Sequence, residues 1–158
     1  MKSIKVNGEN GLGSLLKIFL QICFALGIII IIILPFALKK LNIDIKISVA
    51  IIYPNGTILL LIMHEFIKLF KSLKNNNPFC DENVKTLKTT GRISFIGALI
   101  WCIDLIIYVL CAKDKNIVTI LTFTFMTILF IGVFVALYIL SELFKEAVDY
   151  KKENELTI

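Results

Sequence analysis

Asp104 is the residue whose position most suggests a chemical role. It is the only charged residue in the four apolar runs of the chain, which cover 18–38, 47–63, 93–112 and 117–141. A charged side chain at the centre of a membrane helix costs at least about 2.5–3.5 kcal/mol on insertion scales, so an acid there faces a protein interior or stays protonated. A functional Asp104 would take part in a proton or ion step, or contact a ligand. The alternative is a neutral acid hydrogen-bonded to Gln21, to a threonine of the last run or to a backbone carbonyl. We favour this alternative, because one acid without a second buried charge makes a poor relay.

The remaining reactive residues do not form a catalytic or metal-binding set. His64 and Glu65 are adjacent, so on a helix they point about 100° apart and cannot share one ion; we expect Glu65 to pair with Lys68 or Lys71. The cysteines show no C-x-x-C spacing and have no histidine nearby in sequence, which argues against disulfides and zinc. They are Cys23, Cys80, Cys102 and Cys111. Without a nucleophile–base pair or a phosphate-binding loop, we expect no enzyme and no cofactor.

The apolar runs predict an all-α integral membrane protein with four transmembrane helices in a bundle. Hydrophobic residues make up 58% of the chain and its mean hydropathy is +0.87, values that a soluble domain of 158 residues could not accommodate. A hydrocarbon core of about 30 Å needs roughly 20 helical residues. Backbone groups in lipid must bond within the segment, so even the isoleucine run 28–33 is expected to be helical. The predicted spans are about 18–38, 47–70, 93–112 and 117–141.

The second span has two possible starts. Tyr53-Pro54-Asn55-Gly56 is typical of a turn, so the helix could begin at Pro54, in the first-turn position that proline tolerates. That start would place His64 and Glu65 near the middle of the bilayer, which is costly. We favour a start near Ile47, with a kink at 54–56, because it brings Glu65 to the interface.

The basic residues predict the orientation. Most of the 17 Lys and Arg residues lie in the segments that share a side with the N-terminus, so both termini are expected in the cytoplasm, at the bacterial plasma membrane. The net charge of +5 is therefore interpreted as a topology signal and not as direct nucleic-acid binding. We expect a flexible leader over 1–14 and a transmembrane domain over 15–158. Helices 2 and 4 should extend into the cytoplasm, with a cytoplasmic loop over 71–92 between helices 2 and 3 and a cytoplasmic C-terminal helix over 142–158.

Two stretches resemble a known family. Residues 77–87, NPFCDENVKTL, are similar to the "NPF-S-x-EN-V-x-x-L" signature of a four-span bacterial family, domain of unknown function 2975. Residues 143–158 are similar to its closing "F-x-x-A…E-N-x-L-T-V/I". The resemblance extends from about Leu15 to Ile158, and Cys80 departs from it where the family usually has serine, a better helix cap than a thiol.

The resemblance implies a partner and not a reaction. Members are often found beside a very small helix-turn-helix regulator, which implies a membrane-anchored regulator or sensor that binds this DNA-binding protein. The candidate partner-binding residues are Asn77, Pro78, Phe79, Asn83, Leu87, Phe144, Asn154, Leu156 and Thr157. The alternative role of the two stretches is to brace the helices against each other. Two other functions stay open: a small transporter, efflux or immunity-type protein that uses Asp104, and a structural subunit of a membrane complex.

Small residues in two spans allow close helix contacts. They are Ser94, Gly97 and Ala98 in the third span, and Gly132 and Ala136 in the fourth. Such spacing lets backbones approach within one bundle or between two copies. We favour packing within one bundle and keep a homo-oligomer as the alternative.

Overall fold

The computed structural model describes four long helices over residues 12–39, 45–74, 79–112 and 116–156, with side chains described over 14–39, 49–72, 79–112 and 116–154. The helices are α1 (Leu12–Lys39), α2 (Ile45–Lys74), α3 (Asp81–Cys111) and α4 (Ile117–Leu156). Each is long and apolar enough to cross a membrane. The prediction of an all-α protein with four transmembrane helices packed as a bundle is confirmed.

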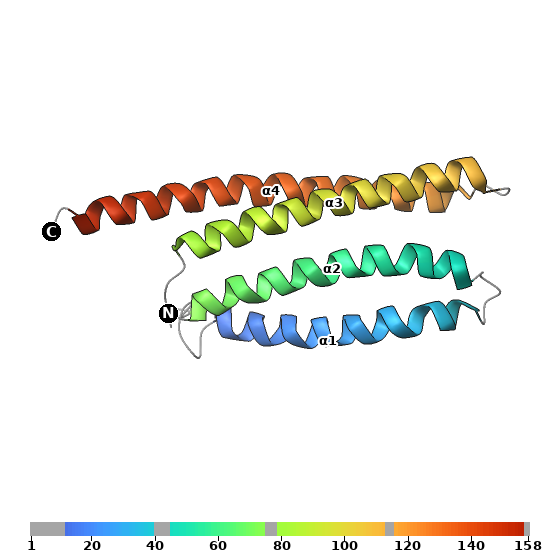
Figure 1. The fold of residues 1–158 in the computed structure, drawn as a ribbon, viewed down its shortest axis with the longest axis horizontal. Helices are drawn as coiled ribbons and strands as arrows, with labels where there is room; N and C mark the ends of the chain where they lie inside the picture. The colour runs from blue at the N-terminus through green and yellow to red at the C-terminus, as the bar shows by residue number, and fades with distance from the viewer. Residues whose placement is uncertain (1–11, 40–44, 75–78, 113–115, 157–158) are drawn as a thin grey trace, which may run out of the picture.

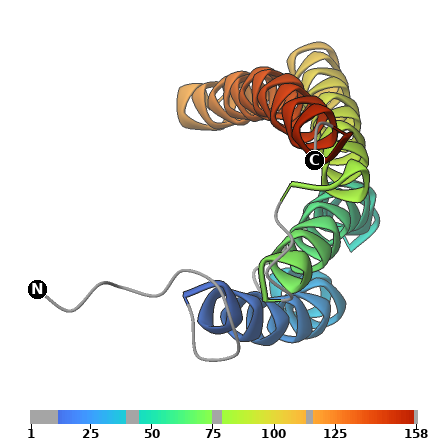
Figure 2. The same ribbon diagram turned by 90° about the vertical axis from the view of Figure 1, so that its left-hand side faces the viewer.

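The four helices pack in chain order. α1 lies against α2, α2 against α3 and α3 against α4, and these are the helix pairs in contact within the described part of the chain. Figure 1 shows the four helices side by side, with the start of α1 and the end of α4 at the same end of the molecule. Seen along the helices in Figure 2, they form a curved row, open on one side, and not a closed square. We call the end formed by the start of α1, the end of α2, the start of α3 and the end of α4 the terminal end.

The core lies where α2, α3 and α4 meet. It consists of four buried side chains, Ile58, Ile62, Ala98 and Phe130. Gly97 makes this crossing possible: a Cβ atom there would lie 2.6 Å from the ring of Phe130 and 2.9 Å from Ile58. The small residues of α3 therefore serve packing inside one bundle. Gly132 of α4 has no neighbour within 4 Å of an added Cβ atom, so its side of α4 faces outward.

The second helix starts early, as we favoured. α2 begins at Ile45 and carries Pro54 in its interior, so the Pro-Asn-Gly sequence does not form a turn. The salt bridge predicted for Glu65 is also present, with Nζ of Lys68 2.6 Å from Oε1 of Glu65. Both results follow from the bilayer, which favours an unbroken helix and places the charged pair near its surface.

The segment described as a loop between the second and third spans contains the end of α2 and the start of α3. α2 continues to Lys74 and α3 already begins at Asp81, so most of the predicted loop 71–92 is helical. Gly91 does not interrupt α3, and it lies against Phe134 and Leu137 of α4. Of the predicted leader 1–14, residues 1–11 lie outside the described part of the chain, and α1 starts at Leu12.

Helix lengths exceed what a membrane requires. α4 has 40 residues, which corresponds to roughly 60 Å, or about twice the hydrocarbon thickness. The apolar part of α4 ends at Leu140, and charged residues recur from Glu142 onward. The surplus length therefore lies at the terminal end, where α4 runs beside the start of α3 (Figure 1).

Candidate functional site

Asp104 is hydrogen-bonded to a neighbouring helix. Nδ2 of Asn55, on α2, donates to Oδ2 of Asp104 over 2.7 Å, and the same nitrogen donates to the carbonyl of Ile51 over 2.9 Å. The expectation of a hydrogen-bonded acid was right, but none of the partners we named is involved. Gln21 lies exposed on α1, which packs on α2 alone among the described helices.

One polar atom of Asn55 lacks a hydrogen-bond partner. Its residue is only 9% exposed, and Oδ1 is buried without a hydrogen-bond partner. Both hydrogens of Nδ2 are used, so turning the amide over would place its oxygen against the carbonyl of Ile51 and lose that bond. An acceptor buried without a donor is costly in an apolar environment, where no water compensates it.

Asn55 also lines a groove between α1 and α2. The groove has a volume of about 560 Å³, and Asn55 is the only amide or charged side chain among its lining residues. Its wall on α1 includes Leu26 and Ile30, its wall on α2 includes Leu59 and Met63, and Trp101 of α3 contributes at the side. The groove can accept an apolar molecule, and Asn55 brings one amide side chain to its wall.

A second set of contacts braces the terminal end. The rings of Phe79 and Phe144 lie 5.4 Å apart between centroids, which joins the start of α3 to the end of α4. Nζ of Lys152 lies 2.9 Å from Oδ2 and 3.0 Å from Oδ1 of Asp81, beyond the apolar part of α4. The Asp81 carboxylate raises the pKa of the Lys152 ammonium above its ordinary value, through this hydrogen bond and its charge. Such exposed pairs fix geometry more than they add stability.

Two residues of the stretch 77–87 are buried between helices. Asn83 is 2% exposed, and its Oδ1 accepts a hydrogen bond of 2.8 Å from the hydroxyl of Ser72 on α2. Leu87 is 1% exposed. Nζ of Lys88 also lies 2.9 Å from Oε1 of Glu142, which adds an ion pair between α3 and α4. The structure therefore places Asn83 and Leu87 in the contacts between helices, as our bracing alternative expected.

The other candidate partner-binding residues are only partly described. Asn77, Pro78 and Thr157 lie outside the described part of the chain, and of Leu156 only the backbone is described, at the end of α4. Asn154 is exposed near the end of the same helix.

Cys80 begins α3 without capping it. It is the N-cap residue in extended conformation, and its side chain makes no capping hydrogen bond. Its carbonyl accepts the backbone N–H of Asn83 over 3.1 Å. Asp81 lies inside the first turn, with its carboxylate on Lys152.

The sequence did not reveal which side of the α4 extension is free. The helical spacing of the sequence predicts one apolar stripe on this extension, through Leu140, Leu143, Phe144, Ala147 and Val148. In the structure Val148 is 3% exposed and Phe144 packs on Phe79, whereas Leu143 is 56% exposed. Leu143 and Tyr150, which is 67% exposed, lie seven residues apart and share one face of the helix. Their spacing was visible in the sequence, but the rotation of α4 about its axis was not.

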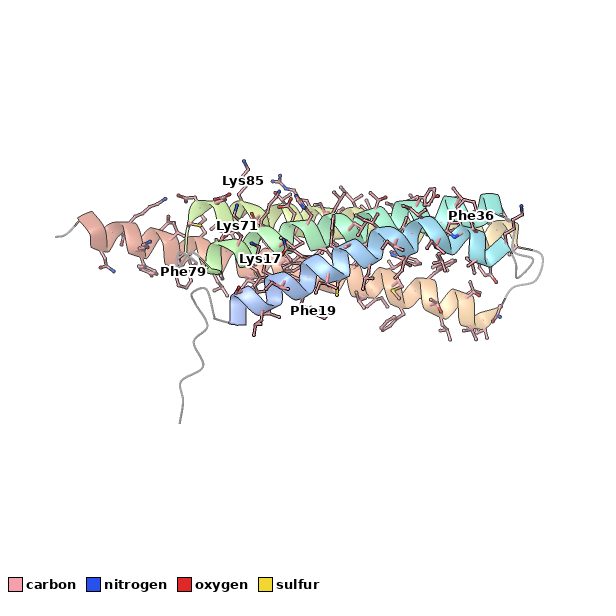
Figure 3. All side chains as sticks on the ribbon, turned by 90° about the horizontal axis from the view of Figure 1, so that it is seen from below. Lys17, Phe19, Phe36, Lys71, Phe79 and Lys85 are labelled. Carbon is pink, nitrogen blue, oxygen red and sulfur yellow. The ribbon has the colours of Figure 1, made fainter. Side chains whose placement is uncertain are left out.

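Basic side chains surround the same end. Figure 3 shows Lys17, Lys71 and Lys85, from three successive helices, near the terminal end, with Phe79 beside them. Phe36 lies near the opposite end (Figure 3). Within the described residues no three His, Cys, Asp or Glu side chains come together in a way that could hold a metal ion.

The match to a family extends over nearly the whole chain. The family described as protein of unknown function (DUF2975) matches residues 14–158, which include all four helices and both stretches at the terminal end. The chain belongs to the DUF2975 family. No curated protein and no solved structure matches it. This DUF2975 protein is thus a multi-pass membrane protein by its four candidate spans, and its function has to be argued from its own residues.

Proposed function

We propose that this DUF2975 protein is a membrane-anchored regulator without enzymatic activity, and that it binds a small soluble helix-turn-helix protein at its terminal end. The observation that carries the proposal is the free face of the α4 extension. Leu143 and Tyr150 are exposed beyond the apolar part of α4, and we infer that they lie outside the membrane. Exposed apolar residues grouped on one helix face are a feature of protein-binding surfaces.

The brace supports this role because it makes the surface rigid. Phe79 packs on Phe144, and Asp81 pairs with Lys152 on the next turns of α4. A binding face that is already ordered loses less conformational entropy when a partner docks. The basic residues favour the cytoplasmic side for this end, which is where a DNA-binding protein would be met.

The identity of the partner comes from the family resemblance. A helix-turn-helix regulator held at the membrane would be kept from its operator, and a signal received by the spans could release it. Such switching requires a signal that binds the two arrangements with different affinity.

The test is crosslinking in intact cells, followed by purification from solubilised membranes and mass spectrometry. We expect a small DNA-binding protein crosslinked to Lys145 or Lys151, which flank the free face. Leu143→Ala with Tyr150→Ala should abolish this crosslink while the protein stays in the membrane. The matched control, Val118→Ala with Leu121→Ala, changes two exposed residues of α4 near its other end and should leave the crosslink intact.

Two results would contradict the proposal: recovery of membrane proteins alone, or a crosslink that survives the change at 143 and 150. The pair Phe79→Ala and Phe144→Ala is a poorer test, because these rings pack on each other and their loss also removes the brace.

A transporter that uses Asp104 has weaker support. The groove beside Asp104 has apolar walls apart from Asn55, so it offers an ion no continuous polar path. A purely structural subunit would fit the result in which only membrane proteins co-purify.

A further inference from the structure

The groove between α1 and α2 goes beyond the proposed docking role and does not depend on it. It lies between the apolar stretches of these helices, on the side of α2 where Trp101 of α3 also reaches. Lipid tails alone could cover apolar walls, so volume and lining by themselves identify no ligand. Asn55 distinguishes this groove, because its Oδ1 lacks a hydrogen-bond donor and a lipid tail has none to offer.

The interaction that Asn55 lacks is one hydrogen bond from a donor to Oδ1. Nδ2 of Asn55 is already bonded to Asp104 and to Ile51, whereas Oδ1 is buried without a partner. Oδ2 of Asp104 accepts the bond from Asn55, which fixes the position of the amide nitrogen. A molecule that completes the site is therefore apolar along its length and carries a single neutral donor near the level of Asn55.

We propose that this groove binds a lipid-soluble molecule that carries a hydroxyl group, and that Oδ1 of Asn55 accepts the hydrogen bond from the hydroxyl. Oδ1 is covered in the structure, so the ligand reaches it when the groove opens. Among the described helices α1 contacts α2 alone, so a shift of α1 would open the groove without displacing α3 or α4.

The contact between α1 and α2 is suited to opening. Gly27 of α1 and Gly56 of α2 lie against Leu60 and Ile31 of the opposite helix. Within the described residues no hydrogen bond or ion pair joins the two helices, so their separation breaks only apolar contacts and the packing of Phe24 near His64. Apolar contacts given up to a ligand are replaced by contacts with the ligand.

Trp101 provides the measurement. It is the only tryptophan of the chain and it lines the groove. A bromine atom in contact with an indole ring quenches its fluorescence. The purified protein in detergent would be titrated with a long-chain alcohol that carries bromine at the far end of its chain, and with the bromoalkane of equal length.

The alcohol should quench the natural protein at about fivefold lower concentration than it quenches Asn55→Leu, the size expected of one net hydrogen bond. The bromoalkane should quench both proteins equally, which removes differences in partition into detergent. Thr57→Leu is the matched control: it lies two residues away on the exposed side of α2, outside the groove, and should behave as the natural protein.

A second variant keeps the test independent of the polar pair. Leu26→Phe narrows the groove and leaves Asn55 and Asp104 in place, so it should weaken quenching by both probes. Equal quenching of the natural protein and of Asn55→Leu by the alcohol would overturn the proposal, and so would unchanged quenching in Leu26→Phe. A bromine-labelled amine that binds more tightly than the alcohol, and loses this advantage in Asp104→Asn, would replace the hydroxyl site by a cation site.

Discussion

The two halves of the bundle are held together by different means. α3 and α4 are joined along their length by buried side chains, several aromatic pairs and two ion pairs, with Leu87, Ser94 and Ser141 almost fully covered. α1 meets α2 through glycines and branched apolar side chains, with no hydrogen bond or ion pair among the described residues. From this difference we infer that α3 and α4 form a rigid unit, which we call the frame, and that α1 is the helix that can move. The proposed docking face lies on the frame, and the proposed ligand groove lies at the movable helix.

The largest expected effect comes from opening a cavity in the frame. Leu87→Ala removes a side chain that is 1% exposed and should lower the free energy of unfolding by about 2–5 kcal/mol. Leu15→Ala, on the exposed surface of α1, should change it little, because lipid or detergent contacts that side chain in both states. Far-UV circular dichroism during unfolding in mixed detergents measures both. Equal losses in the two variants would mean that the halves are not held differently.

Overpacking tests the same contrast at the helix crossing. Gly97→Val should destabilise the protein by about 1–3 kcal/mol, since a Cβ atom there would meet Phe130 and Ile58 at less than 3 Å. Gly132→Val, with nothing within 4 Å, should stay within about 0.5 kcal/mol of the natural protein. The same unfolding assay applies. A large loss in Gly132→Val would instead show that this face of α4 packs against a second copy.

Much of the helical architecture could be predicted from the sequence. The number of helices follows from the apolar runs, and the pairing of Glu65 with Lys68 follows from helical spacing. The bracing of the two terminal stretches was expected as one of two alternatives. These features depend on the local periodicity of the sequence and on the requirements of the bilayer. Neither requires knowledge of how the helices are arranged in space.

The movable half was harder to predict because it depends on how helices are rotated and ordered in space. Asn55 and Asp104 are 49 residues apart, and no local pattern links them. Asn55 was also hidden in a Tyr-Pro-Asn-Gly pattern typical of turns, which the membrane environment overrides in favour of a helix. The signal that could have found it is simple: Asn55 is an amide in an otherwise apolar run, and such residues pair with other polar residues inside membranes. The order of helices in a curved row has no comparable signal.

The smallest expected effect concerns the hydrogen-bonded pair of Asn55 and Asp104, which links α2 to α3. Asn55→Leu and Asp104→Leu each leave one polar group without its partner, whereas the double variant removes both. We therefore expect the double variant to be less destabilised than the sum of the single variants, by about 0.6 kcal/mol and at most about 1.7, the range found for hydrogen bonds between membrane helices. Thr57→Leu combined with Asp104→Leu serves as the control and should be additive, because Thr57 lies exposed on α2. Additivity in the Asn55 cycle would mean that the pair does not couple α2 to α3. The groove would then border a helix contact that depends on packing alone, and Asn55 would be free to turn its amide toward a ligand without losing a bond to Asp104.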